Sequence, residues 1–350
     1  MPSWPDVHSL PLWPVHFKPL PDELLSSLIV RLAYGHGVKV RTFSRLVFPS
    51  QEIWNRDIDR NAPPALLSMI AANTGASYEA LYKSSLKAYE GVLYKQYQLS
   101  SILPWVLPLQ VYEWKRNGFA QHYCPSCLAN DGIPYYRRSW RIAYCTWCPQ
   151  HACMLHNSCF SCGSCVAFHR CDLGNFDISD VSSIHRCWHC GFDYRDTPRI
   201  AADFYSPDIL ASFRTLLVAL EASQSADTSD SIVQFHNVLH HLCLLLGMKN
   251  KQVAIADFAC AALSIDQISK PTRRQPIESR SLDERHHLVQ LAIWYLLQLD
   301  ERLTAAWVNR SITYNRLLKD LRDLPDWYGD VVSKFTHWRD RLKPPPFECY

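Results

Sequence analysis

The stretch between residues 124 and 190 decides what kind of fold this chain can form. It contains, in order, Cys124-Pro-Ser-Cys127, Cys148-Pro-Gln-His151, Cys159-Phe-Ser-Cys162 and Cys187-Trp-His-Cys190. Two ligands separated by two residues can hold one metal ion from a single turn, and a second such pair completes a tetrahedron. Thiolate and imidazole groups suit Zn²⁺. The spacing therefore predicts one zinc ion bound by Cys124, Cys127, Cys148 and His151, and another bound by Cys159, Cys162, Cys187 and Cys190.

Other ligand sets are open on spacing alone. Eleven of the 14 cysteines lie in this stretch, a density that indicates metal ligands rather than free core thiols. The alternative donors are Cys145, Cys153, Cys165, Cys171, His185 and His189. We prefer the first set because it pairs the short motifs cleanly and leaves no site with five ligands. Since four protein groups fill each site and no His-x-Glu or His-Glu-x-x-His motif accompanies them, we expect structural zinc.

Composition limits the class of protein. The chain has 350 residues, of which 48% are hydrophobic and 20% charged, as in a folded protein of two or three domains. Its net charge of only +3 excludes a histone-like or polybasic protein, so any contact with nucleic acid must come from a local patch. No basic segment followed by an apolar one begins the chain, and we expect a cytoplasmic protein.

Hydrophobic spacing divides the chain into four parts and predicts a mainly α fold. Residues 1–21 are an arm rich in proline and aromatic residues, and a helical domain with a helix-turn-helix follows over residues 22–120. Residues 121–198 form the tandem zinc-finger module, which we expect to be zinc-ribbon-like. Residues 199–350 form a helical C-terminal domain.

The helix-turn-helix prediction rests on residues 63–87. Pro63-Pro64 begins a helix that ends at Asn73-Thr74-Gly75, and Ser77 caps a second helix that runs to Lys87. This second helix would be the recognition helix, with Tyr82, Lys83 and Lys87 among its solvent-facing residues. An ordinary helical hairpin has the same turn chemistry and is the alternative.

The C-terminal part has six stretches of helical period. They are residues 209–220, 232–246, 253–263, 285–299, 312–321 and 327–342. The loop over residues 269–281 carries Arg273 and Arg274 and is the most basic loop of the chain; it is either a solvated linker or a phosphate contact. A hairpin around residues 304–321 would make a second helix-turn-helix.

Several motifs together resemble the TniQ/TnsD family, the target-selection proteins of multi-component DNA transposons. These motifs are Leu20-Pro-Asp-Glu-Leu-Leu-Ser-Ser-Leu-Ile-Val-Arg-Leu-Ala33, Tyr123-Cys-Pro-Ser-Cys-Leu128, Tyr135-Tyr-Arg-Arg-Ser-Trp-Arg141, Cys148-Pro-Gln-His151, and the two Cys-x2-Cys-Gly sequences that begin at Cys159 and Cys187. The resemblance covers about residues 15–195. The family's two zinc-binding fingers match the eight preferred ligands residue for residue. This chain departs from the family by its additional thiols at Cys145, Cys153, Cys165 and Cys171.

The resemblance implies a non-catalytic adaptor for transposition in a bacterial cytoplasm. Such a protein binds a target marker, either target DNA or a CRISPR effector complex with its guide RNA, and recruits an AAA+ ATPase regulator (TnsC-like). In the guide-dependent branch the family member forms a homodimer. The resemblance favours a bridge between effector and ATPase, and the alternative within the family is a TnsD-like protein that homes to one chromosomal sequence. Rivals from other classes are a zinc-dependent nucleic-acid enzyme and a free-standing transcription regulator.

The resemblance also suggests roles for two groups of side chains. Trp4, Trp13 and Phe17 would anchor the arm on the ATPase, or else pack on the protein's own first helices. Arg137, Arg138 and Arg141 would face phosphate or RNA, with Trp140 between them in the core.

Overall fold

A computed structural model describes residues 12–49, 53–99, 102–110, 118–173, 183–222, 230–248, 254–268, 275–319, 321 and 323–335. The chain separates into two compact units. The first comprises residues 1–90, 97–202 and 220–225, and the second comprises residues 91–96, 203–219 and 226–350. The first unit thus includes residues 121–198, the expected zinc module, and the expected helical domain of residues 22–120 except for residues 91–96.

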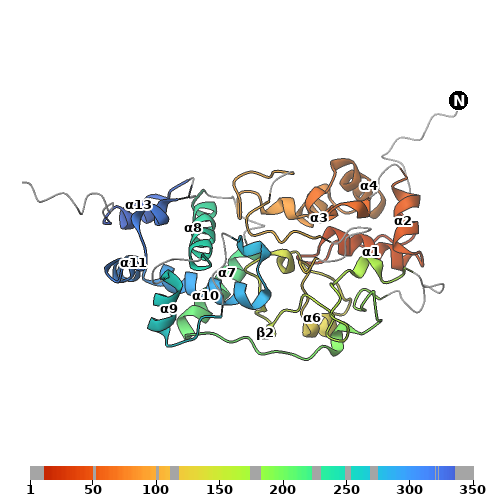
Figure 1. Ribbon diagram of the computed structural model, residues 1–350. Coiled ribbons are helices and arrows are strands. Elements are labelled where there is room, and N and C mark those ends of the chain that lie inside the picture. The colour runs from red at the N-terminus through yellow and green to blue at the C-terminus, as the bar shows by residue number, and fades with distance from the viewer. Residues whose placement is uncertain are drawn as a thin grey trace, which may run out of the picture. The chain divides into compact units, whose positions relative to one another are not determined.

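The first unit is built from short helices and one small hairpin (Figure 1). Its α-helices are α1 (Leu25–Gly35), α2 (Val40–Val47), α3 (Ile58–Asn61), α4 (Pro64–Thr74), α5 (Tyr78–Lys83) and α6 (Pro125–Asn130). Its 3-10 turns are η2 (Ile53–Asn55), η3 (Leu86–Tyr89), η4 (Ser139–Arg141), η5 (Phe168–Arg170) and η6 (Tyr194–Asp196). Strands β1 (Trp147–Cys148) and β2 (Cys153–Met154) pair in antiparallel fashion.

Helix α1 lies at the centre of the first unit. Every residue from Leu25 to Ala33 is buried, so the polar side chains on the helix need partners inside the protein. Ser26 donates to Asp59, and Arg31 pairs with Glu23 at 3.2 Å. The helix therefore packs on all sides against the rest of the unit.

The expected helix–turn–helix segment is present as a helical hairpin, with one correction. Gly75 ends α4 in the left-handed conformation at φ +66°, and the Ser77 hydroxyl caps α5 by accepting from the Ala80 amide, as predicted. However, α5 ends at Lys83, whereas the sequence predicted a helix to Lys87. The hydroxyls of Ser84 and Ser85 bind the carbonyls of Ala80 and Tyr82, and such bonds compete with helix continuation. DNA reading by this hairpin stays a prediction.

The second unit is helical, and most of α7 lies in it. Its elements are α7 (Pro207–Ala222), α8 (Asp230–Leu246), α9 (Ile255–Leu263), η7 (Ile277–Ser279), α10 (Leu282–Leu297), α11 (Leu299–Val308), α12 (Tyr314–Leu318) and α13 (Asp326–Val332). The mainly α class is therefore confirmed, while α11 is a helix that the sequence analysis did not separate. Helices α11 and α12 follow one another within the segment where a second hairpin was expected, with Arg310 at φ +59° in the turn between them, and a second helix-turn-helix there stays a prediction.

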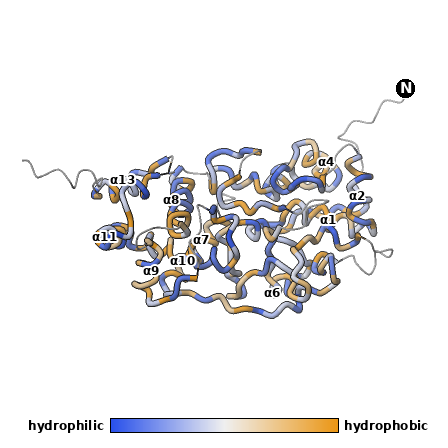
Figure 2. The backbone as a smooth tube through the Cα atoms, viewed as in Figure 1, coloured by the Kyte–Doolittle hydropathy of each residue, from blue (hydrophilic) through white to orange (hydrophobic). Residues whose placement is uncertain are grey.

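Apolar and polar residues are interspersed along the helices of both units (Figure 2). In the second unit, α8 and α10 bury one another's apolar residues, including Leu242, Leu246 and Leu288. Among the described residues, none of the helices is both long and apolar enough to cross a lipid bilayer.

Candidate metal centres

Helix α6 and the β1–β2 hairpin supply the first group of ligands. Cys124 is the N-cap residue of α6, and its Sγ accepts from the Cys127 amide at 3.4 Å. Pro125 occupies the first turn, where a missing N–H costs nothing. Cys148 ends β1, and His151 lies in the turn before β2, where Ala152 takes a positive φ of 49°. Local turns thus direct both pairs of side chains to one point.

The distances in this first cluster suit a tetrahedral ion. Nδ1 of His151 lies 3.6, 3.3 and 3.4 Å from the sulfurs of Cys124, Cys127 and Cys148, and 3.6 Å separate the sulfurs of Cys127 and Cys148. A tetrahedron with Zn–S bonds of about 2.3 Å has ligand atoms roughly 3.8 Å apart. All four ligand atoms lie within 4.8 Å of one another.

Two further groups lie next to the first cluster. The side-chain amide of Asn130 is 3.2 Å from Nε2 of His151. The Asn130 atom at this distance is the nitrogen Nδ2; when Nδ1 of His151 binds a metal and Nε2 carries the proton, the amide has to turn its oxygen toward the ring to accept that proton. The sulfur of Cys153 lies 3.7 Å from that of Cys124, but Cys153 is outside the four-residue cluster.

The second cluster consists of two matching turns. The amides of Gly163 and Gly191 donate to the carbonyls of Cys159 and Cys187, at 2.8 and 2.9 Å. Both glycines have a positive φ, at 70° and 74°, which other residues rarely adopt. The glycine that follows each Cys-x2-Cys motif therefore closes a tight turn around the thiols, as the sequence predicted.

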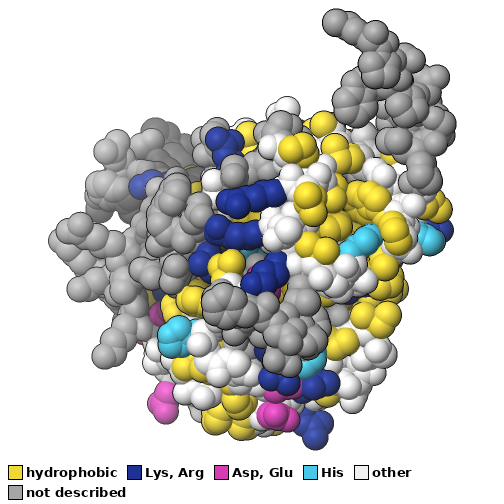
Figure 3. All heavy atoms as spheres, turned by 90° about the vertical axis from the view of Figure 1, so that its right-hand side faces the viewer, with side chains coloured by type: hydrophobic (Ala, Val, Ile, Leu, Met, Phe, Trp, Pro, Cys, Tyr) yellow, Lys and Arg dark blue, Asp and Glu magenta, His cyan; other side chains and the backbone are white. Residues whose placement is uncertain are grey.

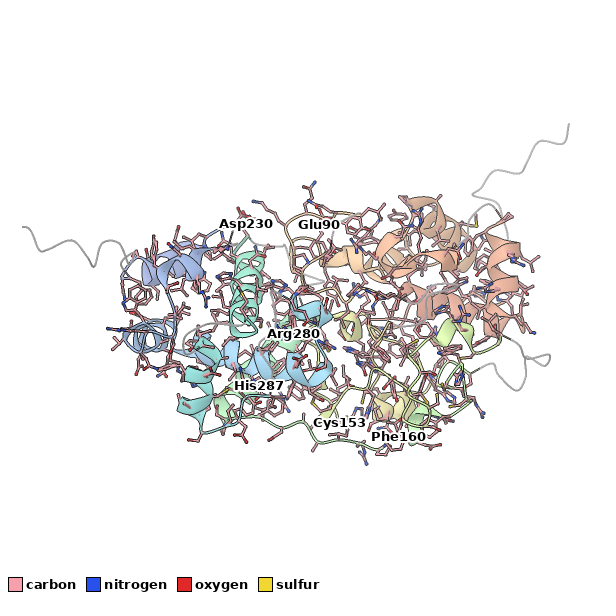
Figure 4. All side chains as sticks on the ribbon, in the orientation of Figure 1. Glu90, Cys153, Phe160, Asp230, Arg280 and His287 are labelled. Carbon is pink, nitrogen blue, oxygen red and sulfur yellow. The ribbon has the colours of Figure 1, made fainter. Side chains whose placement is uncertain are left out.

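The four sulfurs of this second cluster also lie within 4.8 Å of one another. Cys159 is 3.6 Å from Cys190, and Cys162 is 3.7 Å from Cys187. Unlike the first cluster, this one has two exposed ligands, Cys162 and Cys190. In Figure 4, Phe160 marks the second cluster and Cys153 the neighbourhood of the first.

A series of hydrogen bonds supports the second cluster. His185 bonds through Nε2 to the Ser183 hydroxyl and through Nδ1 to Asp193 at 3.1 Å. Arg195 binds both oxygens of the Asp193 carboxylate, at 2.7 to 3.1 Å. Although burial acts to raise the pKa of Asp193, these bonds hold it at about 2, so the carboxylate stays ionised and fixes the loop beside Cys187.

The structure thus brings together the eight predicted ligands in two groups, and these are the only groups of three or more potential ligands within the described ranges. Two of the additional thiols lie outside both groups of ligands. Cys165 is in a small apolar core, and the Cys171 thiol donates to the Arg186 carbonyl. Three cysteines with one histidine, and four cysteines, are donor sets that could each hold a metal ion and are consistent with two zinc sites.

The three predicted arginines are engaged inside the first unit. Arg137 makes two hydrogen bonds of 3.0 Å to Asp131 and stacks on Tyr135 and Trp140. Arg138 and Arg141 are fully buried, and their guanidinium groups pair with Asp22 at 3.2 Å and Asp57 at 2.5 Å. The prediction of phosphate contact assumed exposed guanidinium groups, and for Arg138 and Arg141 the structure places the charge in the interior instead.

The candidate residues of α5 and η3 are partly exposed. Lys83 pairs with Glu79 at 2.7 Å, one turn earlier on the same helix. The Lys87 ammonium donates to the Ala62 carbonyl and lies 5.1 Å from the centre of the Tyr97 ring. Burial raises the pKa of the Tyr82 hydroxyl, which is half-buried.

The described part of the arm lies on the first unit's own helices. The Trp13 ring meets Phe43 and His36 at centroid distances of 5.5 and 6.1 Å, and its amide donates to the Asn73 carbonyl. Phe17 remains 37% exposed, with the Arg31 guanidinium 5.2 Å from its ring centre. Trp4, Arg273 and Arg274 lie outside the described residues.

Sequence reasoning missed the carboxylates that hold the arginines. Asp22, in the left-handed conformation at φ +55°, accepts from the Arg138 side chain and from the Ser139 amide. Asp59 is 3.5 Å from Arg141, and burial together with nearby Asp57 raises its pKa to about 6. The one available signal was that Asp22 lies within the residue 20–33 motif.

Residues 20–33 and 135–141, two of the motifs that carry the resemblance, form hydrogen bonds with each other. Besides the Asp22–Arg138 pair, the Leu24 amide donates to the Tyr136 carbonyl and the Tyr136 amide donates to the Ser27 hydroxyl. Two segments more than a hundred residues apart in the sequence therefore form one structural unit.

Comparison with known proteins agrees with this unit. Residues 14–155 match the TniQ family model, a range that contains helices α1 to α6 and the whole first cluster. No curated protein matches the chain. The chain therefore contains a TniQ domain over residues 14–155, and the docked motifs and the first thiol cluster lie within it.

Proposed function

We propose that this protein is a non-catalytic targeting adaptor for DNA transposition. The observation that carries the proposal is the TniQ domain over residues 14–155, because that domain belongs to transposition-associated proteins. In this proposal the chain links a target-recognition complex, a CRISPR effector with its guide RNA, to an AAA+ ATPase regulator, and so directs where the transposon inserts. It would act in the bacterial cytoplasm and as a homodimer.

Structural zinc is the second part of the proposal. Four protein ligands at each cluster would fill a tetrahedral Zn²⁺ and leave no open position for substrate. The first ion would tie α6 to the β1–β2 hairpin, and the second would join the two Cys-x2-Cys-Gly turns. Each ion would stabilise a segment that has little regular secondary structure of its own. This absence of an open position supports an adaptor rather than a zinc enzyme.

The exposure of Phe17 supports a docking role for the part of the arm around this residue. Phe17 exposes more than a third of its surface, while Trp13 is held against Phe43. We propose that Phe17, with Trp4 and the outer edge of Trp13, contacts the ATPase. Replacing Phe17 by Ala tests this contact without removing the packing of Trp13.

A TnsD-like sequence-specific DNA binder is the second candidate. It is favoured by the α4–α5 hairpin, whose Gly75 turn and Ser77 cap agree with a helix-turn-helix. In that case Tyr82, Lys83 and Lys87 would contact one chromosomal site.

A tagged pull-down from cells that co-express the neighbouring genes of the operon tests the proposal. The adaptor predicts recovery of the effector proteins, the guide RNA and the ATPase together. Recovery of the ATPase alone, with a footprint on a single duplex sequence, would establish the second candidate instead. Recovery of neither partner contradicts both.

A further inference from the structure

The two thiol clusters differ in how far solvent reaches their cysteines. On the face of the first unit that Figure 3 shows, side chains of its hydrophobic class, in which cysteine is counted, reach the surface between basic ones. Among the described cysteines, Cys162 and Cys190 are the exposed ones, and both belong to the second cluster. Cys159 and Cys187, the other two ligands of that cluster, are 1% and 3% exposed. A dissolved reagent can therefore reach the second cluster, whereas all three cysteines of the first are buried.

The chain on either side of the exposed cysteines leaves them open to solvent. The four flanking residues are all exposed, and they are Ser161, Gly163, His189 and Gly191. A Cβ atom added at either glycine would meet no atom of the described residues within 4 Å. Phe160, in the same turn as Cys162, keeps 63% of its surface accessible. The space beside both exposed thiols is therefore open.

Each exposed sulfur lies beside a buried sulfur of the other turn. The sulfur of Cys162 is 3.7 Å from that of Cys187, and the sulfur of Cys190 is 3.6 Å from that of Cys159. An oxidised cysteine condenses with a neighbouring thiol to form a disulfide, so each of these pairs has the composition that such a reaction needs. In the first cluster, His151 fills one position and cannot take part in a disulfide.

We propose that the second cluster is an oxidant-responsive site, which hydrogen peroxide converts from a zinc site into two disulfides, Cys162–Cys187 and Cys159–Cys190. The inference rests on the structural zinc of the proposed function, because zinc ligands are thiolates and the thiolate is the form of cysteine that attacks peroxide. Hydrogen peroxide is small and uncharged, so the negative charge of four thiolates does not repel it. The first cluster, whose cysteines are buried, keeps its metal under the same conditions.

The reaction at each pair of sulfurs consumes one molecule of peroxide. The exposed thiolate attacks one peroxide oxygen; an S–O bond forms as the O–O bond breaks, and the second oxygen leaves as water after taking up a proton. The product is a sulfenic acid. The buried thiolate then attacks the sulfenic sulfur; an S–S bond forms as the S–O bond breaks, and this oxygen also leaves as water with a proton. Two electrons have passed from two sulfurs to one peroxide.

The two disulfides would replace zinc as the link between the turns. Cys159 and Cys162 come from one turn and Cys187 and Cys190 from the other, so both disulfides run from turn to turn. Because the thiolate is the metal ligand, loss of the four thiolates releases the ion. A thiol reductant reverses both disulfides by exchange and restores the zinc site.

Oxidation of the zinc-loaded full chain tests the proposal. The chain is treated with a small excess of hydrogen peroxide, catalase removes the remainder, and zinc is measured in the ultrafiltrate without any chelator. One of the two ions should appear in the filtrate. Mass spectrometry of unreduced peptides should find the Cys162–Cys187 and Cys159–Cys190 disulfides. Dithiothreitol with added zinc should return the chain to two bound ions.

The matched variant Cys162→His/Cys190→His replaces both exposed thiols by another zinc ligand. It should still bind two ions, because two cysteines and two histidines also make a tetrahedral zinc site, and peroxide should release zinc from it more slowly by about tenfold or more. Cys171→Ser removes a buried thiol outside the ligand group and should lose one ion at the wild-type rate. If the double variant does not bind the second ion, the disulfides of the wild-type chain decide.

Several outcomes would overturn the proposal. They are retention of both ions in peroxide, equal loss of the two ions, loss of zinc with all four thiols still free, disulfides within each Cys-x2-Cys motif, and release from the zinc-loaded double variant at the wild-type rate. The zinc count before oxidation separates this proposal from the proposed function. Two bound ions that peroxide does not release contradict the oxidant response alone, whereas a chain that binds no zinc contradicts the structural zinc as well.

Discussion

The guanidinium group of Arg141 binds the carboxylate of Asp57, with 2.5 Å between Nη2 and Oδ2, across 84 residues of sequence. Arg141 also donates to the Leu107 carbonyl and lies 3.5 Å from Asp59. This one side chain joins the segment between the two ligand pairs of the first thiol cluster to helix α3, whose N-cap is Asp57. It shows that the segment carrying the first thiol cluster and the N-terminal helices share one buried interior.

Replacing Arg141 by Ala should destabilise the first unit strongly. The change leaves two buried carboxylates without their cation, and breaking a buried pair in this way typically costs about 3–5 kcal/mol. Urea unfolding followed by circular dichroism measures the loss. Arg45→Ala, which removes an exposed arginine, is the control and should change stability by less than about 0.5 kcal/mol. A similar small change for Arg141→Ala would mean that the Asp57 pair does not hold the unit together.

The two thiol clusters should release zinc at different rates. Cys162 and Cys190 are exposed in the second cluster, whereas all three cysteines of the first are buried. A chelator that changes colour on binding zinc should therefore show two phases of about one ion each, with the second cluster emptying first. Cys162→Ser should remove the fast phase only. A single phase for both ions, or a fast phase that survives Cys162→Ser, would contradict this order.

The position of Cys153 makes a spectroscopic prediction about the ligands of the first cluster. Its sulfur is 3.7 Å from that of Cys124 but lies outside the ligand group. Cobalt-substituted Cys153→Ala should thus keep the ligand-field bands of the wild type, with metal affinity lowered roughly tenfold or more by the loss of a neighbouring group. His151→Ala should shift those bands. If Cys153→Ala shifts them and His151→Ala does not, Cys153 is the fourth ligand.

Acid should weaken the second unit through His287. This residue is buried on α10, where the Tyr205 hydroxyl and the Gln267 carbonyl group hold its ring at 2.6 Å on either side. Burial, and then His286, lower its pKa to about 4. Between about pH 4 and 6.5 the unfolded chain takes up a proton that the folded chain does not, so stability is present above this window and falls as the pH falls through it.

Two histidine-to-glutamine variants, one at His287 and one at an exposed histidine, test this loss of stability in acid. The free energy of unfolding of the wild type should fall between pH 7 and pH 5 by up to about 2 kcal/mol on account of this one group. The fall should be smaller in His287→Gln, and His16→Gln, at an exposed position, should behave as the wild type. Identical pH dependence in all three proteins would show that His287 is not the acid-sensitive group.

The thiol clusters could be predicted from sequence because their geometry is local. The shape of each turn is determined by the two residues between its ligands and, after Cys162 and Cys190, by a glycine. These features do not depend on the rest of the chain. The same reasoning placed Gly75 and Ser77 at the ends of α4 and α5. Here the deciding interactions lie within a few residues of one another.

The burial of the arginines could not be predicted in this way, because their partners are distant in the sequence. Arg138 meets Asp22 across 116 residues, and Arg141 meets Asp57 across 84. In the sequence, Arg137-Arg138 beside Arg141 is a basic cluster; in the fold, two of the three charges are buried.

Mapping of insertion sites in cells tests the central claim most directly. Cells would carry the transposase, the ATPase and the guide-loaded effector, with or without this chain, and the guide would be reprogrammed to a second target. The adaptor account predicts insertions beside whichever target the guide specifies, and only when the chain is present. Insertions that are unchanged without the chain, or that stay at one chromosomal site whatever the guide, would contradict it.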